Sequence, residues 1–410
     1  MKSLLKKVTI LVVTFQRGGF LMNKKVYILA IASFVVGTVE LILGGILDLI
    51  ADAFHVSLAK AGYLISIYSF VYALSAPILL NVTAKIERKK VYMWTLFIFL
   101  LSNVFSAYSS GYYMLLIGRI LAAASGSFII VLSTTMASRM VKPEYQGRAI
   151  GIVFMGISGS LVLGIPLGIL IGNALGWRQV FVMIAILTAI IMITVWFTME
   201  RLAPAPIVPL KTQVKALRNK KMLAIHLATL FVLAGHLTLY AYFTPFLQET
   251  LGLNTTMVTI IYGIFGLAAV AGGGLGGAVS DRWNPSSSVI TMIALFFVSM
   301  IAMPFGVHLP FVVFLLLMII WSALSWAVSP AQSNLIIHSA RETSDILIST
   351  NAAISHVGIA IGSYVGGIVV NQYSVIYNGW VGSIFVLLGL FCSLYAVTRT
   401  ESTADTLHSK

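Results

Sequence analysis

Residues 178–199 read RQVFVMIAILTAIIMITVWFTM, and no residue after Arg178 in this stretch carries a charge. A helix of about 20 apolar residues can cross the roughly 30 Å hydrocarbon core of a bilayer, so this stretch predicts a transmembrane helix. Similar apolar runs occur along the whole chain. The predicted spans are residues 27–51, 62–84, 91–110, 113–137, 148–172, 178–199, 222–248, 257–279, 288–306, 310–334, 346–371 and 379–398. The sequence therefore predicts an all-α integral membrane protein with twelve transmembrane helices in two six-helix pseudo-repeat halves.

The composition indicates that lipid is the solvent of this chain. Of its 410 residues, 59% are hydrophobic and 9% are charged, whereas a soluble surface carries about 25–35% charged residues. The formal net charge of +14 does not indicate nucleic-acid binding, because the basic residues lie in loops and not in a basic soluble domain. Cys392 is the only cysteine, so one chain cannot form a disulfide or a cysteine-rich metal site.

Motifs for nucleotide or metal chemistry are absent from the sequence. It contains no nucleotide-binding loop, no zinc-ligand spacing and no nucleophile elbow. We therefore expect no cofactor, no enzymatic activity and no ATP-driven work, which leaves an ion gradient as the energy source. The expected partners of a monomeric chain are a small-molecule substrate, protons and membrane lipid.

The distribution of basic residues predicts the orientation. If both termini are cytoplasmic, only Lys60 and Arg178 fall in outer loops and Arg119 falls within a span, whereas the other Lys and Arg residues are cytoplasmic. Such a bias is typical of multi-pass proteins, whose cytoplasmic loops are rich in Lys and Arg. We expect a multi-pass protein of the cell membrane.

The longest polar segment, residues 200–221, contains three prolines followed by Lys211, Lys215, Arg218, Lys220 and Lys221, and predicts a cytoplasmic linker. It separates an N-terminal half, 23–199, from a C-terminal half, 222–400, and residues 401–410 form a cytoplasmic tail. Residues 1–22 are expected to be a dispensable or mis-assigned extension. They resemble a signal peptide without a good cleavage site, and translation that begins at Met22 is the alternative.

Two landmarks indicate an internal repeat, because duplicated halves place matching elements at a constant offset. The loop that begins at Asn81 matches the loop that begins at Gly277, an offset of 196 residues. The second landmark is a glycine stripe with a spacing of four, and its two copies are offset by 194 residues. These copies are Gly164, Gly168 and Gly172 in the first half, and Gly358, Gly362 and Gly366 in the second. Glycines at this spacing share one helix face, which favours either close helix packing or a moving seam.

Several of these motifs resemble the major facilitator superfamily, whose loop pattern is Gly-x-x-x-Asp-x-x-Gly-Arg-Arg or Lys. Gly277, Asp281 and Arg282 fit that pattern, whereas Asn81 and Lys85 replace its glycine and aspartate in the first copy. Basic character remains there through Arg88, Lys89 and Lys90. The stretch 164–168 (GIPLG) resembles the glycine-proline motif of antiporters, and 176–178 (GWR) resembles the following drug-exporter signature.

Three further segments resemble bacterial purine base and nucleoside efflux pumps: 38–41 (TVEL), 84–89 (AKIERK) and 234–240 (AGHLTLY). The resemblance implies a drug:proton antiporter type that exports purine bases or nucleosides by alternating access. A broader multidrug or metabolite efflux pump is the alternative within this class, and a non-transporting membrane sensor is the alternative from another class.

Glu40 and Arg119 are the candidate proton-coupling residues. An ionised carboxylate near the middle of a span costs roughly 2.5–3.5 kcal/mol, so Glu40 is either paired or protonated, as a proton carrier requires. Arg119, which stays charged, needs a carboxylate, carbonyl groups or water. We expect Arg119 to influence the proton affinity of Glu40 directly or through water; structural anchoring of both residues is the alternative.

The offset of 196 residues places His236 opposite Glu40 in the repeat, so both are expected to face a central cavity. Imidazole, amide and aromatic side chains could recognise a planar polar substrate, although each could equally be a core or interface residue. The candidate substrate-binding residues are His236, Tyr240, Trp321, Trp326, Gln332, Asn351 and His356. The candidate gating or helix-packing residues are Lys85, Arg88, Gly164, Pro166, Gly168, Gly277, Asp281 and Arg282.

Overall fold

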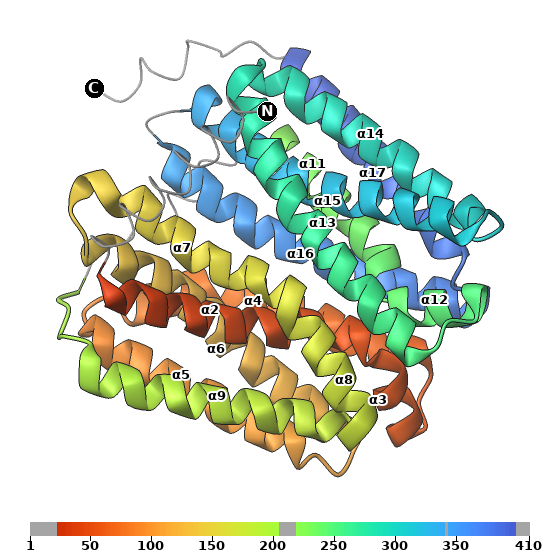
Figure 1. Cartoon of the computed structure of the whole chain (residues 1–410). Helices are drawn as coiled ribbons and strands as arrows, with labels where there is room; N and C mark the ends of the chain where they lie inside the picture. Colours follow the sequence, from red (N-terminus) through yellow and green to blue (C-terminus); the bar gives the residue numbers. More distant parts are fainter. Residues whose placement is uncertain (1–22, 205–218, 341–342, 399–410) are drawn as a thin grey trace, which may run out of the picture.

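The computed structural model describes residues 23–204, 219–340 and 343–398, which form helices and turns and contain no strand (Figure 1). Twelve of the helices are long and apolar enough to cross a membrane, which confirms the predicted fold class. The expected extension 1–22, most of the linker 200–221 and the tail 401–410 lie outside the described residues.

The helices of the two halves follow one another along the chain. The N-terminal half contains α2 (Lys24–Leu41), η1 (Ile42–Gly45), α3 (Leu47–Phe54), α4 (Leu58–Val82), α5 (Arg88–Ala107), α6 (Tyr112–Arg139), η2 (Pro143–Tyr145), α7 (Gln146–Gly159), η3 (Ser160–Gly164), α8 (Ile165–Leu175) and α9 (Trp177–Thr198). The C-terminal half contains α11 (Lys220–Tyr240), α12 (Phe243–Leu251), α13 (Thr255–Arg282), α14 (Pro285–Gly306), α15 (Phe311–Ser339), α16 (Ser344–Gln372) and α17 (Tyr377–Thr398).

Polar side chains cap many helix N-termini, where backbone N–H groups have no partner within the helix. These caps are Asn23, Ser57, Glu87, Asn219, Asn254 and Asn284. Between α8 and α9 the chain turns at Gly176, whose φ of 94° is accessible to glycine without strain. The caps and this turn explain how a nearly continuous apolar sequence is divided into separate helices.

The first and seventh predicted spans, 27–51 and 222–248, are each interrupted in the structure. The backbone leaves the helical region at Ile46 (φ −126°, ψ 22°) and at Tyr242 (φ −116°, ψ 24°). These two positions are 196 residues apart, which is the offset found in the loops. A Cβ added to Gly44 would lie 3.4 Å from the carbonyl oxygen of Tyr240, so the two interruptions meet. Contact between the halves, which apolar composition does not reveal, therefore accompanies the interruptions.

The fifth span contains a π-helical turn, η3, immediately before Pro166. Proline has no backbone N–H to donate to the preceding turn, and a π turn accommodates the missing bond. The backbone N–H of Ile165 accordingly donates to Ser160, five residues earlier. Pro166 thus shapes the helix at the point where it meets the other half.

The glycine stripes lie inside the halves. In the first half, the stripe residues Gly164, Gly168 and Gly172 face Thr38, Ile42 and Ile46 respectively. In the second half, Gly358, Gly362 and Gly366 face the backbone carbonyls of Leu230, Ala234 and Thr238. Each stripe brings the fifth helix of its half close to the first helix, which favours close packing as its role.

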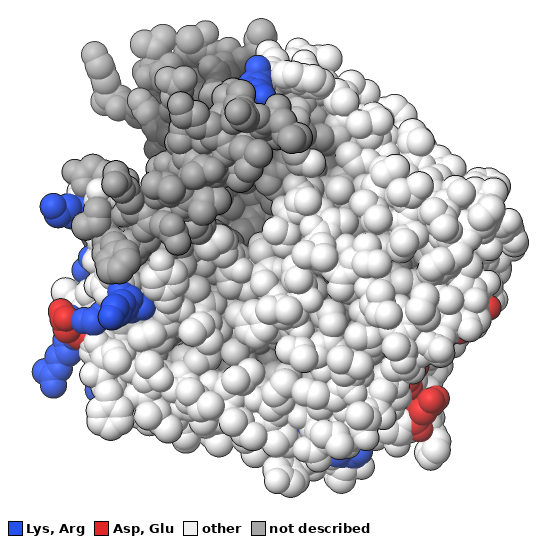
Figure 2. All heavy atoms as spheres, viewed as in Figure 1, with Lys and Arg blue, Asp and Glu red and all other residues white. Residues whose placement is uncertain are grey.

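The halves meet along a seam, defined here as every contact between the N-terminal and C-terminal halves. It is formed mainly by α4 against α16 and by α13 against η3 and α8, with α12 against η1 and α3 at one end. Most hydrogen bonds across the seam lie toward the end of the bundle that carries α3 and α12, the α3/α12 end. The pairs are Ser66–Ser363 (2.9 Å), Asp48–Gln248 (3.2 Å), Gly44–Tyr262 (3.2 Å) and Asn173–Thr255 (3.4 Å). Figure 2 shows Lys and Arg gathered mainly at the opposite end and a largely uncharged belt between. The structure is therefore closed at the α3/α12 end.

Candidate functional site

Glu40 reaches the seam from α2. It lies six residues before the interruption at Ile46, and 16% of its side chain is exposed. Its carboxylate oxygen Oε1 lies 3.6 Å from Nδ1 of His356, which belongs to α16 in the other half. The ring of Tyr72, from α4, stacks on the His356 ring with centroids 4.0 Å apart. The structure thus places His356, expected to bind substrate, beside the expected proton carrier.

Arg119 is fully buried in α6. Its Nη1 donates a hydrogen bond to the carbonyl oxygen of Val39 at 3.0 Å, and its guanidinium lies 4.1 Å from the ring centre of Tyr68. The carbonyl groups in the last turn of a helix are available for such contacts. Arg119 therefore contacts the residue next to Glu40, and its charged atoms lie beyond the 4 Å limit of a direct ion pair with Glu40.

The aromatic cluster, defined as His236, Tyr240, Phe265, Phe296 and Trp321, occupies the interior of the C-terminal half. The His236 ring stacks on Tyr240 at 5.2 Å and lies 5.3 Å from Trp321. Three buried polar atoms have no hydrogen-bond partner: His236 Nδ1, Tyr240 OH and Trp321 Nε1. An unsatisfied buried polar group costs about 1–3 kcal/mol, so the cluster has an unused capacity for hydrogen bonding.

The aromatic cluster occupies the repeat position that Glu40 and its neighbours occupy in the first half. Tyr68 and Phe265 are 197 residues apart, as are Phe99 and Phe296, while Glu40 and His236 are 196 apart. His236 lies six residues before the interruption at Tyr242, as Glu40 does before Ile46. The predicted equivalence holds for the backbone, but Glu40 faces the seam whereas His236 packs within its own half.

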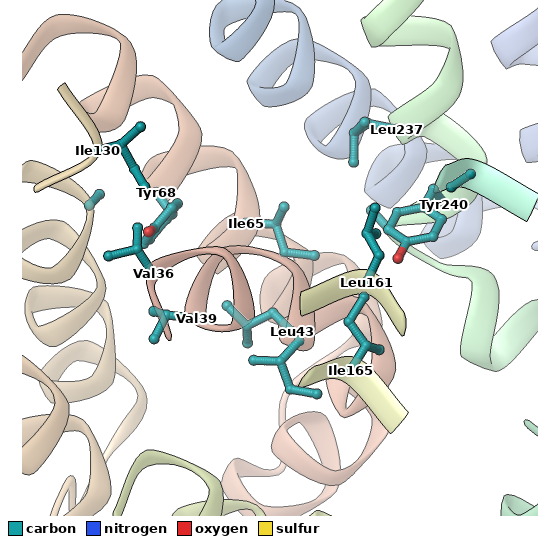
Figure 3. Packing of buried hydrophobic residues seen from close by; sticks show 14 of the residues in the cluster. Val36, Val39, Leu43, Ile65, Tyr68, Ile130, Leu161, Ile165, Leu237 and Tyr240 are labelled. Carbon is teal, nitrogen blue, oxygen red and sulfur yellow. The ribbon is translucent and has the colours of Figure 1, made fainter. Parts of the chain in front are cut away.

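Tyr240 is the residue of the aromatic cluster that lies next to the first half. Figure 3 shows its ring beside Leu161, which belongs to η3. The ring of Phe265 lies 4.9 Å from the Tyr240 ring, and a Cβ added to the next residue, Gly266, would lie 2.7 Å from the carbonyl carbon of Leu161.

Gln332 and Asn351 belong to a separate polar network with two residues that the sequence interpretation missed, His226 and Thr229. The hydroxyl of Thr229 lies 2.8 Å from both Gln332 Oε1 and Asn351 Oδ1, and His226 Nδ1 lies 3.0 Å from Asn351 Oδ1. The network links α11, α15 and α16. A lone histidine near the start of an apolar run was the signal for it. Trp326 is partly buried against the core and lies outside the aromatic cluster.

The first loop motif anchors α5. Glu87 accepts hydrogen bonds from the backbone N–H groups of Lys89, Lys90 and Leu202. Burial acts to raise the pKa of Glu87, but these three bonds outweigh it and lower the pKa. The ammonium group of Lys89 donates to carbonyls at the end of α9. Of the expected gating residues, Lys85 is exposed, whereas Arg88 is buried and its Nη1 lies 3.4 Å from the carbonyl oxygen of Thr83.

The second loop motif connects α13 to α15. A Cβ added to Gly277 would lie 4.0 Å from Pro330, so the helices pass without crowding there. Asn334 donates to the carbonyl oxygen of Ser280 at 3.0 Å and lies 3.5 Å from Asp281 Oδ1. Arg282 is exposed. Both copies of the loop motif thus fasten helix ends within their own half.

A comparison with protein families identifies the fold and the motifs together. The sequence model described as Major Facilitator Superfamily matches residues 29–347. The chain belongs to the Major Facilitator Superfamily. Membership in this family makes it a multi-pass membrane transporter rather than an enzyme, as the apolar helices and the absence of catalytic motifs predicted.

Two curated relatives of this superfamily cover nearly the whole chain. The "Uncharacterized MFS-type transporter YbcL" of Bacillus subtilis (strain 168) is 36% identical over 90% of this chain and 95% of its own length. A "Probable sugar efflux transporter" of Helicobacter pylori (strain P12) is 27% identical over 92% of this chain and 96% of its own.

Two solved superfamily structures share the fold. A bacterial homolog of the human lysosomal transporter Spinster, in an inward-facing and occupied conformation, has a TM-score of 0.76 at 16% identity and covers 92% of this chain and 96% of its own. A D-xylose-proton symporter has a TM-score of 0.71 at 16% identity, with coverages of 90% and 96%.

Proposed function

We propose that this transporter is a proton-coupled antiporter that exports a small organic molecule. The observation that carries the proposal is the position of Glu40, a partly exposed carboxylate inside a membrane span at the seam between the halves. Ionisable residues at this depth commonly mark ion pathways and proton relays. A carboxylate at a surface that opens and closes can load a proton on one side and release it on the other.

Arg119 supports the proposal as a fixed positive charge close to the chain segment that carries Glu40. Its contact with Val39 links the guanidinium to the turn of α2 that carries the carboxylate. The halves rock about the central site in alternating access. A proton that arrives from outside neutralises Glu40 and favours the return of the empty carrier, and substrate bound from inside favours proton release.

Purine bases and nucleosides are the first candidate substrates. The aromatic cluster offers stacking faces with an unpartnered imidazole nitrogen, hydroxyl and indole N–H, which suits a planar heterocycle with donors and acceptors. Sugars are the second candidate class, because relatives with 26–27% identity over 92% of this chain and 96% of their own length are named "Probable sugar efflux transporter". Broader drug or metabolite efflux remains a third class.

The proposed orientation puts both termini in the cytoplasm of a cell membrane. The basic residues gather at the end opposite α3 and α12 (Figure 2), as the bias of cytoplasmic loops toward Lys and Arg requires. The α3/α12 end, where the structure is closed, then faces outward.

The experiment is transport into inverted membrane vesicles that contain the folded protein. Labelled adenine, hypoxanthine, guanosine and a sugar panel are offered with and without an imposed proton gradient, and an ionophore serves as the control. Accumulation of a purine that the ionophore abolishes supports purine antiport. Gradient-driven accumulation of a sugar in place of purines would transfer the assignment to the second class. If a panel of drugs and metabolites is then offered and no compound of any class accumulates with the gradient, the result would contradict the proposal.

A further inference from the structure

The contact between Glu40 and His356 joins ionisable side chains from different halves. Glu40 belongs to α2, and His356 belongs to α16, 316 residues later. Of the two ion-pair contacts found among the described residues, this one crosses the seam, while the other joins Lys25 of the first half to Glu200, the first residue of the linker. The remaining seam contacts near the α3/α12 end do not pair an acid with a base.

The two side chains of the pair lie close together without forming a hydrogen bond. At 3.6 Å, Nδ1 of His356 lies just outside hydrogen-bond distance of Glu40, and this nitrogen has no hydrogen-bond partner. Tyr72 stacks on the imidazole with an interplanar angle of 29° and limits its rotation. His356 is therefore held between two residues of the opposite half, so rocking of the halves changes this contact directly.

We propose that His356 is a second proton-coupling residue, which shares one proton with Glu40 across the seam. When the pair binds a second proton, the contact between the two residues weakens and the halves can separate there. The inference rests on the proposed function. It assigns a role to a residue of the second half, so coupling does not reside in the first half alone.

Proton counting explains why the contact is a switch. With one proton, the pair is either carboxylate with imidazolium or carboxylic acid with imidazole, and both forms attract. With two protons, a neutral acid faces an imidazolium and the ionic attraction is lost. With none, a carboxylate faces a neutral imidazole, whose single N–H can donate a hydrogen bond when it lies on Nδ1, but no ionic attraction acts between them. The tie between the halves is strongest in the one-proton state.

The other titratable groups around the pair keep a constant charge in the physiological range. Arg119 remains positive, and Tyr68 and Tyr72, which face Glu40 from α4, remain neutral phenols. A change in the charge of this region therefore comes from Glu40 or His356.

Disulfide crosslinking at the α3/α12 end provides a test that is independent of transport. Ser66 and Ser363 face each other across the seam with hydroxyl oxygens 2.9 Å apart. Ser66→Cys and Ser363→Cys are introduced together with Cys392→Ser, which removes the native thiol. The crosslinked fraction of the full-length protein in liposomes is measured between pH 5 and pH 8.

The comparison variant is His356→Gln, and His338→Gln is the matched control because His338 is exposed at the end of α15. The ratio of the two variants at each pH removes the pH dependence of thiol oxidation. We expect the control to lose closure as the pH falls, and His356→Gln to show a closed-to-open ratio about threefold to tenfold lower at neutral pH with a flat profile.

A second variant keeps the test informative if His356→Gln fails to fold. Tyr72→Leu removes the ring that holds the imidazole and should weaken the pH response, whereas Tyr72→Phe keeps the stack and should preserve it. Identical pH profiles for His356→Gln and the control, or for the two Tyr72 variants, would overturn the inference. Absence of proton-driven transport with an intact crosslinking response would instead refute the proposed function.

Discussion

Gly362→Ala is expected to destabilise the protein by forcing α16 away from α11. The added Cβ would overlap the carbonyl oxygen of Ala234 and would lie 2.8 Å from its carbonyl carbon and Cα, roughly 0.6 Å short of ordinary contact at 3.4 Å. The obstacle is backbone, which cannot rotate out of the way as a long side chain can. Overpacking of this kind costs about 1–3 kcal/mol, so the melting temperature should fall by roughly 2–6 °C.

The matched control for this change is Gly274→Ala. Gly274 is exposed in α13 and has no atom within 4 Å of an added Cβ, so alanine should be neutral or slightly stabilising through its better helix propensity. Melting is followed by intrinsic fluorescence of the purified protein in detergent. If both variants melted at the wild-type temperature, the close packing of α16 on α11 described here would be wrong.

Three further predictions concern single side chains. Glu87→Gln should lower the melting temperature at neutral pH but not at acidic pH, because the lowered pKa of Glu87 means that its stabilising bonds are present above its ordinary range near 4.5 and lost below it; equal losses at both pH values would refute this. Burial raises the pKa of Asp48 despite the hydrogen bond from Gln248, so the folded state favours the protonated acid. The folded protein therefore loses stability as the pH rises from the ordinary pKa of an aspartate to the raised pKa of Asp48. In the Ser66→Cys, Ser363→Cys background, Asp48→Asn should therefore increase crosslinking at neutral pH. A decrease in crosslinking would contradict the direction of this pKa shift. Tyr240→Phe removes a buried hydroxyl without a partner, so stability should stay equal or rise while substrate transport falls; unchanged transport kinetics would exclude that hydroxyl from the site.

The sequence was sufficient to predict the helical spans and the repeat. Apolar runs of about 20 residues are set by bilayer thickness, and this local constraint leaves twelve such runs visible in the sequence. The offset of 196 residues, taken from two loops, also relates the interruptions at Ile46 and Tyr242. The interruptions themselves could not be predicted, because Gly44 and Tyr240 meet only when the halves pack together.

The arrangement of the candidate site could be predicted only in part. The equivalence of Glu40 and His236 followed from the repeat, and the contact of Arg119 with the neighbourhood of Glu40 followed from the need of a buried guanidinium for a polar partner. The contact of Glu40 with His356 depends on the seam, where helices distant in sequence meet. Apolar periodicity does not show which residues of distant helices lie opposite one another. For this reason the sequence also did not predict the network around His226, which links α11, α15 and α16.

The role of Glu40 is tested most directly by comparing the wild-type protein with Glu40→Gln in liposomes. A labelled substrate identified in the vesicle assay is added outside the liposomes, and its accumulation inside is measured. Glutamine keeps the shape of the side chain and cannot carry a proton. We expect gradient-driven accumulation by the variant to be lower by a factor of about ten or more, equivalent to about 1.4 kcal/mol. Substrate exchange without a gradient should continue. Gradient-driven accumulation at the wild-type level by a folded Glu40→Gln protein would contradict the assignment of Glu40 as the proton carrier.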